Sequence, residues 1–458
     1  MFKKSGTGRF ILSVLAVFLV VGLASNSMIS ANASVKSKTS PAFPSVPNST
    51  KVSIKLASYL PIFGAQATGM LNKLISDFQK LHPNITISIE PETVTAAGAI
   101  SSQVQQDAIT NQTPDIVQIP FGEMLNLVHN FNGVNLTKVV GGTSLAAQWG
   151  GANPYAPAIT KLGEIDGNVY ALPWTLSTPL LFYNADLFKA AGLDPSTPPT
   201  TWPQLARYSL ALKKLPGVTG IVDGCVGAAA AGSDWCLQSM IFSASGTVMN
   251  AKRTATTFDN PQLITAMKSL QSLGSSGAIE NLTNAQAIQA WGAGKLGMML
   301  NSSALQAGLI RANGGHFQMM VANEPGFGHT ISVPTNSGSG LVMLSTNKIK
   351  QQAAWALMQY LTSAESMTAI TENIGYAPLR PSIVNLPQYL KGWAAAQPYL
   401  APAMDQLSRI RQWQAYPGPN YANLQQILLN AATSIAFQGA DPQTTMVAAQ
   451  GLAAGLIK

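Results

Sequence analysis

The first part of the chain alternates between the two periodicities that distinguish strands from helices. Val52, Ile54 and Leu56 are separated by polar or small residues, which is the two-residue period of a strand. Apolar residues then recur at spacings of three and four over residues 70–81, a pattern that predicts one helix face ending before Pro83. An alternating run, a helical run and another apolar run follow at residues 85–92, 101–111 and 115–120. This β-α-β-α-β order predicts a parallel sheet with crossover helices, so the chain is α/β in class.

The rest of the chain continues in the same alternation. Residues 170–184 form a long strand-like run that contains two prolines, and a helix is predicted from Asn184, as its cap, to Gly192. A helix ending at 288–291, a strand at 295–300 and an amphipathic helix at 348–361 are predicted further on.

The N-terminus has the pattern of an export signal. Three basic residues precede an apolar run at 10–24, and Ala31-Asn32-Ala33 then gives the A-x-A pattern of a cleavage site. The alternative, a single anchoring helix, is disfavoured because the apolar run is too short for a hydrocarbon core of about 30 Å. We therefore expect a signal peptide over residues 1–33, export to the periplasm or the outer face of the cell envelope, and, with no cysteine near the cleavage point, no lipid anchor. The Ser/Pro-rich residues 34–50 are expected to form an extended tether.

Export makes the two cysteines informative. Cys225 and Cys236 lie eleven residues apart, and in an oxidising compartment we expect them to pair as a disulfide. Two buried free thiols are the alternative.

Charge is scarce in this chain. Its 458 residues include 27 Lys+Arg and 19 Asp+Glu, so charged residues make up 10%, against roughly 25% in typical soluble domains. With 47% hydrophobic residues, the composition argues against disorder. The net charge of +8 comes from positive residues scattered singly, which disfavours nucleic acid as a partner.

No strong catalytic motif is present. The four histidines are far apart, and neither a metal-binding spacing nor a phosphate-binding glycine loop is found, so we expect no metal and no cofactor. This favours a binding protein over an enzyme. The alternative is a secreted carbohydrate-active hydrolase, whose two carboxylates the sequence does not single out.

Several blocks, in order, resemble the extracellular solute-binding proteins (family 1) of sugar-type ABC importers. They are GNVYALPWTLSTPLLFYN, ADLFKAAGLDP and PPTTWPQL within residues 167–205, then WGAGKLGMMLNSSA, SGSGLVMLSTNKIKQQAAWALMQYLTSAESM and IGYAPLRPSI. Within that group the chain is most similar to the glycerol-3-phosphate-binding component.

The resemblance implies a type II periplasmic-binding-protein-like fold, with two α/β lobes joined by three crossovers around a ligand cleft. The crossovers map near residues 172–177, 300–302 and 340–345. The first lobe would hold residues 51–172 and 301–340, and the second 173–300 and 341–458. The implied protein is a monomer that captures a sugar, polyol or glycerophosphodiester by lobe closure and delivers it to the importer's membrane permease.

The resemblance also indicates ligand-binding residues, each with a structural alternative. Hydroxyl groups would come from Ser177, Thr178, Ser302 and Ser303, unless these only form local turn or capping bonds. Gly338 and Ser339 would bring backbone close to the ligand or form a flexible turn, and Tyr376 and Trp235 would contact the ligand or belong to the core. Tyr416 is a further aromatic candidate, Trp174, Trp413 and Tyr421 are weaker ones, and Phe63 and Gln118 are expected first-lobe contacts by strand-end position. If Tyr376 contacts ligand, Tyr376→Ala weakens binding and leaves the ligand-free stability nearly unchanged.

Two departures from the glycerol-3-phosphate binders bear on the ligand. No arginine stands in AYPGPNYANL, where the family's phosphate-gripping arginine is expected, and Arg409 and Arg411 lie upstream of that register. The acidic residue expected after the 115–120 strand is replaced by Phe121, with Glu123 two positions later. Because phosphate is usually held by a bidentate guanidinium or several positive groups, these departures favour a neutral polyol or saccharide.

The scarcity of carboxylates predicts acid tolerance. Acid unfolding follows largely from protonating carboxylates that are ionised and paired in the folded state. We expect circular dichroism to show little loss of structure between neutral pH and about pH 3, as suits an acidic habitat. A loss as steep as that of an ordinary carboxylate-rich protein would refute this expectation.

Overall fold

The computed structural model describes residues 42–90, 99–328, 331–397 and 400–457. The expected signal peptide, residues 1–33, lies outside the described residues, as does the first part of the expected tether. Within the described ranges, no helix has the length and apolar character needed to cross a membrane.

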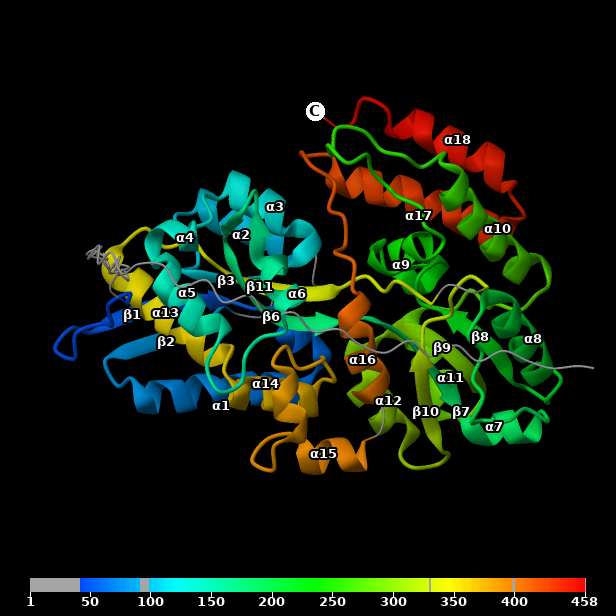
Figure 1. The fold of residues 1–458 in the computed structure, drawn as a ribbon, viewed down its shortest axis with the longest axis horizontal. Coiled ribbons are helices and arrows are strands. Elements are labelled where there is room, and N and C mark those ends of the chain that lie inside the picture. The colour runs from blue at the N-terminus through cyan, green and yellow to red at the C-terminus, as the bar shows by residue number, and fades with distance from the viewer. Residues whose placement is uncertain (1–41, 91–98, 329–330, 398–399, 458) are drawn as a thin grey trace, which may run out of the picture. The chain divides into compact units, whose positions relative to one another are not determined.

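The first lobe is built on a five-stranded sheet (Figure 1). Its order is β2 (Ile85–Ile89), β1 (Val52–Ala57), β3 (Ile116–Pro120), β11 (Ser337–Met343) and β6 (Ala171–Ser177). The pairs β1–β2 and β1–β3 are parallel, whereas β11 runs antiparallel to both β3 and β6. The three parallel strands and the helix predicted at 70–81, α1 (Ala65–Leu81), are confirmed. Further helices of this lobe are α2 (Ala99–Ile109), α3 (Phe121–Asn130), α4 (Leu136–Val139), α5 (Gly141–Trp149), α6 (Pro157–Thr160), α13 (Lys348–Leu361) and α14 (Ala364–Asn373).

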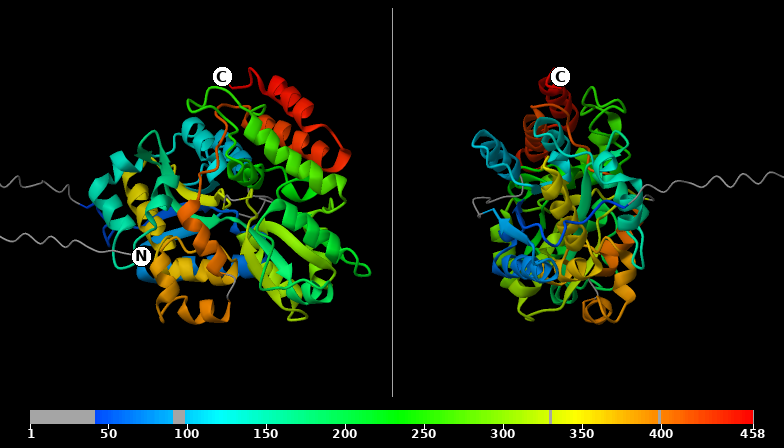
Figure 2. Two further views of the ribbon diagram at one scale, coloured as in Figure 1. Left: turned by 45° about the vertical axis from the view of Figure 1, so that its right-hand side comes forward. Right: turned by 90° about the vertical axis from the view of Figure 1, so that its left-hand side faces the viewer.

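The second lobe is built on a four-stranded sheet. Its order is β10 (Met319–Asn323), β7 (Pro179–Asn184), β9 (Leu296–Ser302) and β8 (Thr219–Asp223), with β8–β9 parallel and the other two pairs antiparallel. The side chain of Asn184 caps α7 (Ala185–Ala190), as predicted. The remaining helices are α8 (Trp202–Leu212), α9 (Trp235–Ser243), α10 (Pro261–Ser275), α11 (Asn284–Gly292), α12 (Gln306–Asn313), α16 (Leu400–Gln406), α17 (Tyr421–Gln438) and α18 (Pro442–Ala453). In the left view of Figure 2 α17 lies between α10 and α18, and it packs against both.

The chain crosses between the lobes three times, but two of the expected positions are wrong. The first crossing joins β6 to β7 at residues 177–179. No crossing occurs at 300–302, because β9 and β10 both pair with β7 in the second sheet. The second crossing is instead the segment between β10 and β11, so residues 319–323 belong to the second lobe rather than the first. The third lies between α14, which packs against α1, and α16, which packs against β10, and it contains α15 (Lys391–Ala396).

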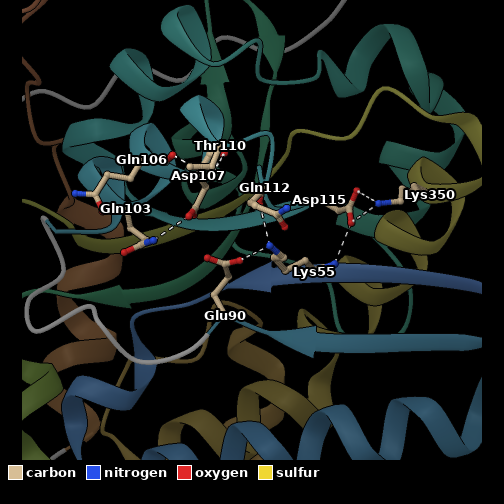
Figure 3. Close-up of polar contacts among 9 residues, drawn as sticks. All are labelled: Lys55, Glu90, Gln103, Gln106, Asp107, Thr110, Gln112, Asp115 and Lys350. Carbon is tan, nitrogen blue, oxygen red and sulfur yellow. Dashed lines mark hydrogen bonds and ion pairs between the residues drawn. The ribbon is translucent and has the colours of Figure 1, made fainter.

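Residues 341–361 were expected in the second lobe and belong to the first. The apolar face of α13 packs on β1 and β11, and an ion pair fixes its N-terminal turn to the same sheet. Lys350 Nζ lies 3.1 Å from Asp115 Oδ2, and the same carboxylate accepts the backbone N–H of Lys55 at 2.9 Å (Figure 3). Lys55 in turn pairs with Glu90 at 2.8 Å. These contacts place several of the chain's few charges at one edge of the first sheet.

The described part of the expected tether packs on the domain. The backbone N–H of Phe43 donates to Ser144 Oγ at 2.8 Å, and Val46 is buried in the core of the first lobe. The Ser/Pro-rich composition concealed these two apolar side chains, whose burial fixes the segment.

Cys225 and Cys236 form the predicted disulfide, and both are buried. The bridge joins the loop after β8 to the first turn of α9. The residue immediately before that turn, Asp234, takes part in the site described next.

Candidate functional site

A cavity of about 300 Å³ is lined by segments of both lobes. The first lobe contributes the N-terminal turns of α3 and the hairpin formed by β4 (Glu164–Ile165) and β5 (Asn168–Val169). The second lobe contributes Arg253 and the backbone and side chains of residues 411–415. The cavity volume lies at the small end of the range for solute-binding pockets.

A larger hollow of about 710 Å³ runs along β10 and α16. It is lined only by second-lobe elements and by the segment that leaves β10. Lobe closure cannot enclose a solute there, so we place the candidate site at the smaller cavity.

Trp413 contacts both lobes. Its indole Nε1 donates to Asp234 Oδ1 at 3.0 Å in the second lobe. The opposite edge of the ring rests on Gly122 in the first turn of α3, where an added Cβ would lie only 2.3 Å from two ring carbons. Glycine is therefore required at position 122 by the approach of the indole. Trp413 was only a weak candidate in the sequence.

Two arginines line the cavity. The Arg411 guanidinium stacks on the ring of Phe242 at 4.0 Å, and its backbone N–H donates to Pro334 O at 2.9 Å. Arg253 donates to the carbonyl of Ala415 at 2.6 Å. Burial lowers the pKa of both arginines, which still leaves them charged at neutral pH. The sequence comparison placed Arg411 out of register, but the fold places it in the cavity wall.

Four of the candidate residues, Phe63, Gln118, Ser339 and Tyr376, lie in the first lobe. Gln118 donates to Ser339 Oγ at 2.9 Å, and Ser339 shares a hydrogen bond of 2.7 Å with Thr175. The rings of Phe63 and Tyr376 meet edge to face at 5.7 Å. Gln118 and Ser339 are fully buried and Tyr376 is 4% exposed. The sequence analysis expected Phe63 and Gln118 in the first lobe and treated Ser339 and Tyr376 separately. The structure places Gln118, Ser339 and Tyr376 in the lobe interior, with Phe63 partly buried against Tyr376.

The four hydroxyl candidates meet at the first crossing. Ser302 Oγ accepts the N–H of Ala304 at 3.1 Å, and Ser303 Oγ accepts that of Thr178 at 3.4 Å. Ser177 ends β6 and is buried. The bond of Ser302 is the local capping bond that was the structural alternative, whereas the bond of Ser303 joins segments 125 residues apart. Thr178 Oγ1 has no hydrogen-bond partner among the described residues.

Gly338 has a φ of +104°, and a Cβ there would lie 2.2 Å from the carbonyl oxygen of Thr175. The expected close backbone approach is present, but its partner is strand β6.

The second-lobe aromatic candidates flank Trp413. The hydroxyl of Tyr416 donates to Asp234 Oδ2 at 2.9 Å and is buried, and Trp235 is partly buried at the start of α9. Trp174 belongs to the first-lobe core. None of the eleven predicted ligand-binding residues lines the cavity, so their contact with ligand stays a prediction.

Asp234 is the residue that the sequence interpretation missed. It is fully buried, and besides Trp413 and Tyr416 it accepts a hydrogen bond from Gln238 Nε2 at 2.9 Å. Burial raises its pKa, while the three donated bonds oppose that rise. In a chain with 19 acidic residues, an aspartate directly before the candidate Trp235 and between the two cysteines was the available signal.

Glu123 lies in the first turn of α3, beside the cavity. Ser101 Oγ donates to its carboxylate, and burial raises the pKa of Glu123 to about 7. Glu123 is only 7% exposed, so it is a buried acid that titrates near neutral pH.

Two α/β lobes, three chain crossings and a cavity lined from both sides define a two-lobed solute-binding fold of the type II periplasmic class. Solved structures share it. UgpB from Mycobacterium tuberculosis in complex with glycerophosphocholine superposes with a TM-score of 0.75 at 20% identity, covering 89% of this chain and 98% of that one. The cyclic alpha-maltosyl-1,6-maltose binding protein from Arthrobacter globiformis gives 0.74 at 18% identity, covering 89% and 99%. A ribitol-bound solute-binding protein from Agrobacterium radiobacter gives 0.68 at 20%, covering 88% and 98%.

The profile of the bacterial extracellular solute-binding proteins matches residues 73–398, more than half of the chain. The chain belongs to this family, whose members are binding proteins and act outside the cytoplasm.

Curated relatives match over a short segment. The sn-glycerol-3-phosphate-binding periplasmic protein UgpB of Shigella flexneri is 48% identical over 61 residues, which is 13% of this chain and 14% of that protein. The UgpB of Escherichia coli K12 is 46% identical over 61 residues, with the same coverage. The matched segment therefore spans about one seventh of the length of these relatives.

Burial of Tyr376 reverses the expectation for its alanine variant. Removing a buried aromatic side chain leaves a cavity, and we expect Tyr376→Ala to lower the unfolding free energy of the ligand-free protein by about 3–5 kcal/mol. Urea unfolding monitored by circular dichroism measures this change. A loss below about 1 kcal/mol would show that the ring is not part of the core.

The raised pKa of Glu123 predicts a pH-dependent stability. The folded state holds this proton up to about pH 7, whereas the unfolded chain releases it near pH 4.3, so the folded state binds more protons in between. The unfolding free energy should therefore fall as pH rises through this window, by on the order of 3 kcal/mol from this group.

Glu123→Gln should remove that slope, as measured by urea unfolding at several pH values. Asp194→Asn is the control of opposite sign, because hydrogen bonds from Ser196 lower the pKa of Asp194. An unchanged slope in Glu123→Gln would contradict the assignment.

Proposed function

We propose that this protein is the exported substrate-binding component of an ABC importer. It captures a small solute in the 300 Å³ cavity and presents it to the membrane permease subunits. The observation that carries the proposal is the wall of that cavity, which both lobes supply and which Trp413 closes against Gly122. Family membership supports the same class of function.

The charges of the cavity favour a solute with an anionic group. Arg253 and Arg411 bring two guanidinium groups, and Glu164 and Asp166 bring two carboxylates from the hairpin opposite. Guanidinium groups match phosphate geometry, and carboxylates suit hydroxyls or a cationic headgroup. A glycerophosphodiester with a cationic headgroup offers all of these, and the glycerophosphocholine bound by one neighbour is of this class. The relatives' names give the related phosphomonoester sn-glycerol 3-phosphate. A neutral sugar or polyol becomes the second candidate.

Capture follows from contacts to both lobes. A solute that touches α3 and residues 411–415 at once binds the closed arrangement more tightly than the open one, and so shifts the population toward closure. The segments about which the lobes would turn are residues 177–179, the segment between β10 and β11, and the segment between α14 and α16.

The hydrolase alternative is weaker. A glycosidase needs two carboxylates that face each other across the scissile bond. Glu164 and Asp166, the two acids in the cavity wall, come from one hairpin and lie on the same side.

The test is a thermal-shift and calorimetric screen of the purified mature chain with glycerophosphocholine, sn-glycerol 3-phosphate, maltose and ribitol. A bound solute at 100 times its Kd adds about 2.7 kcal/mol to stability. We expect glycerophosphocholine to bind, and Arg411→Gln to weaken it at least about tenfold through loss of a charge-assisted contact.

Arg409→Gln is the matched control, because Arg409 pairs with Asp405 at 2.8 Å and does not line this cavity. Its affinity for glycerophosphocholine should be unchanged. If maltose alone binds, the ligand is a neutral sugar and not an anionic solute. Cleavage of model glycosides without any thermal shift would overturn the proposed function.

A further inference from the structure

The carboxylate of Asp234 is bonded only to uncharged donors in the described part of the chain. Its Oδ1 accepts from the indole of Trp413, and its Oδ2 accepts from the hydroxyl of Tyr416 and the amide of Gln238. None of the ion pairs found among the described residues includes it. A buried carboxylate is costly, so three well-placed donors on one such group indicate a specific structural task.

Helix α9, which follows Asp234, also holds the backbone of the cavity wall. Gln238, one turn further along α9, accepts the N–H of Gln414 at 3.0 Å and donates to its carbonyl at 3.1 Å. Asn336, in the second crossing, accepts the N–H of Trp413 at 2.9 Å. The segment that carries Trp413 is therefore fixed to the second lobe on its backbone as well as on its side chain.

The orientation of the indole explains what Asp234 accomplishes. The pyrrole N–H points to Asp234, and the carbons that meet Gly122 belong to the far edge of the six-membered ring. Rotation of the ring about its side-chain bonds would break the hydrogen bond and move that edge off Gly122. One hydrogen bond in the second lobe thus sets a contact made with the first.

We propose that Asp234 is a positioning residue of the ligand cavity, holding the Trp413 indole so that it closes the cavity wall against α3. The inference rests on the proposed function and assigns a specific residue to its closure step. The carboxylate is required because it accepts three hydrogen bonds. An amide of the same shape has one acceptor oxygen and directs its own N–H groups at donors. Holding the wall in place before the solute arrives lowers the cost of binding.

The first experiment needs no ligand. The protein is labelled with 5-fluorotryptophan, and the fluorine resonance of Trp413, one of eight tryptophans, is assigned by its loss in Trp413→Phe. In Asp234→Asn this resonance should shift or broaden. In Asp223→Asn it should not, because Asp223 is an equally buried acid of the same lobe that accepts the N–H of Cys225 and does not line the cavity. An unmoved Trp413 resonance in Asp234→Asn overturns the inference.

The second experiment measures coupling in binding, with glycerophosphocholine as the probe. Asp234→Asn and Trp413→Phe should each weaken binding about tenfold, and the double variant no further, because both remove the same bond. Additive losses, or a loss seen only in unfolding free energy, would indicate a merely structural role and overturn the inference.

If no solute binds, the proposed function fails while the fluorine experiment still decides the position of Trp413. If Asp234→Asn does not fold, Trp413→Phe carries the test, and unchanged affinity overturns the inference.

Discussion

The indole of Trp413 is the contact on which the site depends. Its N–H donates a hydrogen bond to Asp234 of its own lobe at one edge, and its opposite edge meets Gly122 of the other lobe. Because this one side chain contacts both lobes, the cavity depends on the closed arrangement of the lobes. The same contact explains why position 122 has no side chain and why an aspartate with three donors lies at the start of α9. Arg411, two residues before Trp413, enters the wall because the same segment is fixed in place.

The chain has few carboxylates, and several of those it has are inside. Glu123, Asp223, Asp234 and Glu324 are all buried, and burial raises the pKa of each, to about 7 for Glu123 and about 6 for Asp223. Such groups favour the folded state at acidic pH, which is the reverse of the exposed, hydrogen-bonded aspartates on the surface. The structure thus adds a physical reason to the acid tolerance that composition alone suggested. It also shows that charge scarcity does not extend to the cavity, where two arginines and two acids meet.

The fold and the ligand chemistry depend on different features of the chain. Solved relatives near 20% identity share the two-lobed fold over most of both chains, and identity of that size establishes the fold alone. The ligand class rests on the side chains that reach the cavity. Those side chains come from four separated stretches of the chain, and their charges changed our expectation from a neutral solute to an anionic one.

Local pattern in the sequence determined much of this protein. The period-two runs became β1 and β2, the apolar run at 115–120 became β3, and the three-and-four spacing became α1. Export chemistry led to the disulfide between Cys225 and Cys236. Each of these depends on residues close together in the chain. Only tertiary structure decided that β11 inserts between β3 and β6, that β10 joins the second sheet, and that α13 packs on the first. It also decided that Arg253 meets residues 411–415 beside α3. These pairings join segments far apart in sequence, and they depend on which apolar faces fit together, which the periodicity of one segment does not specify.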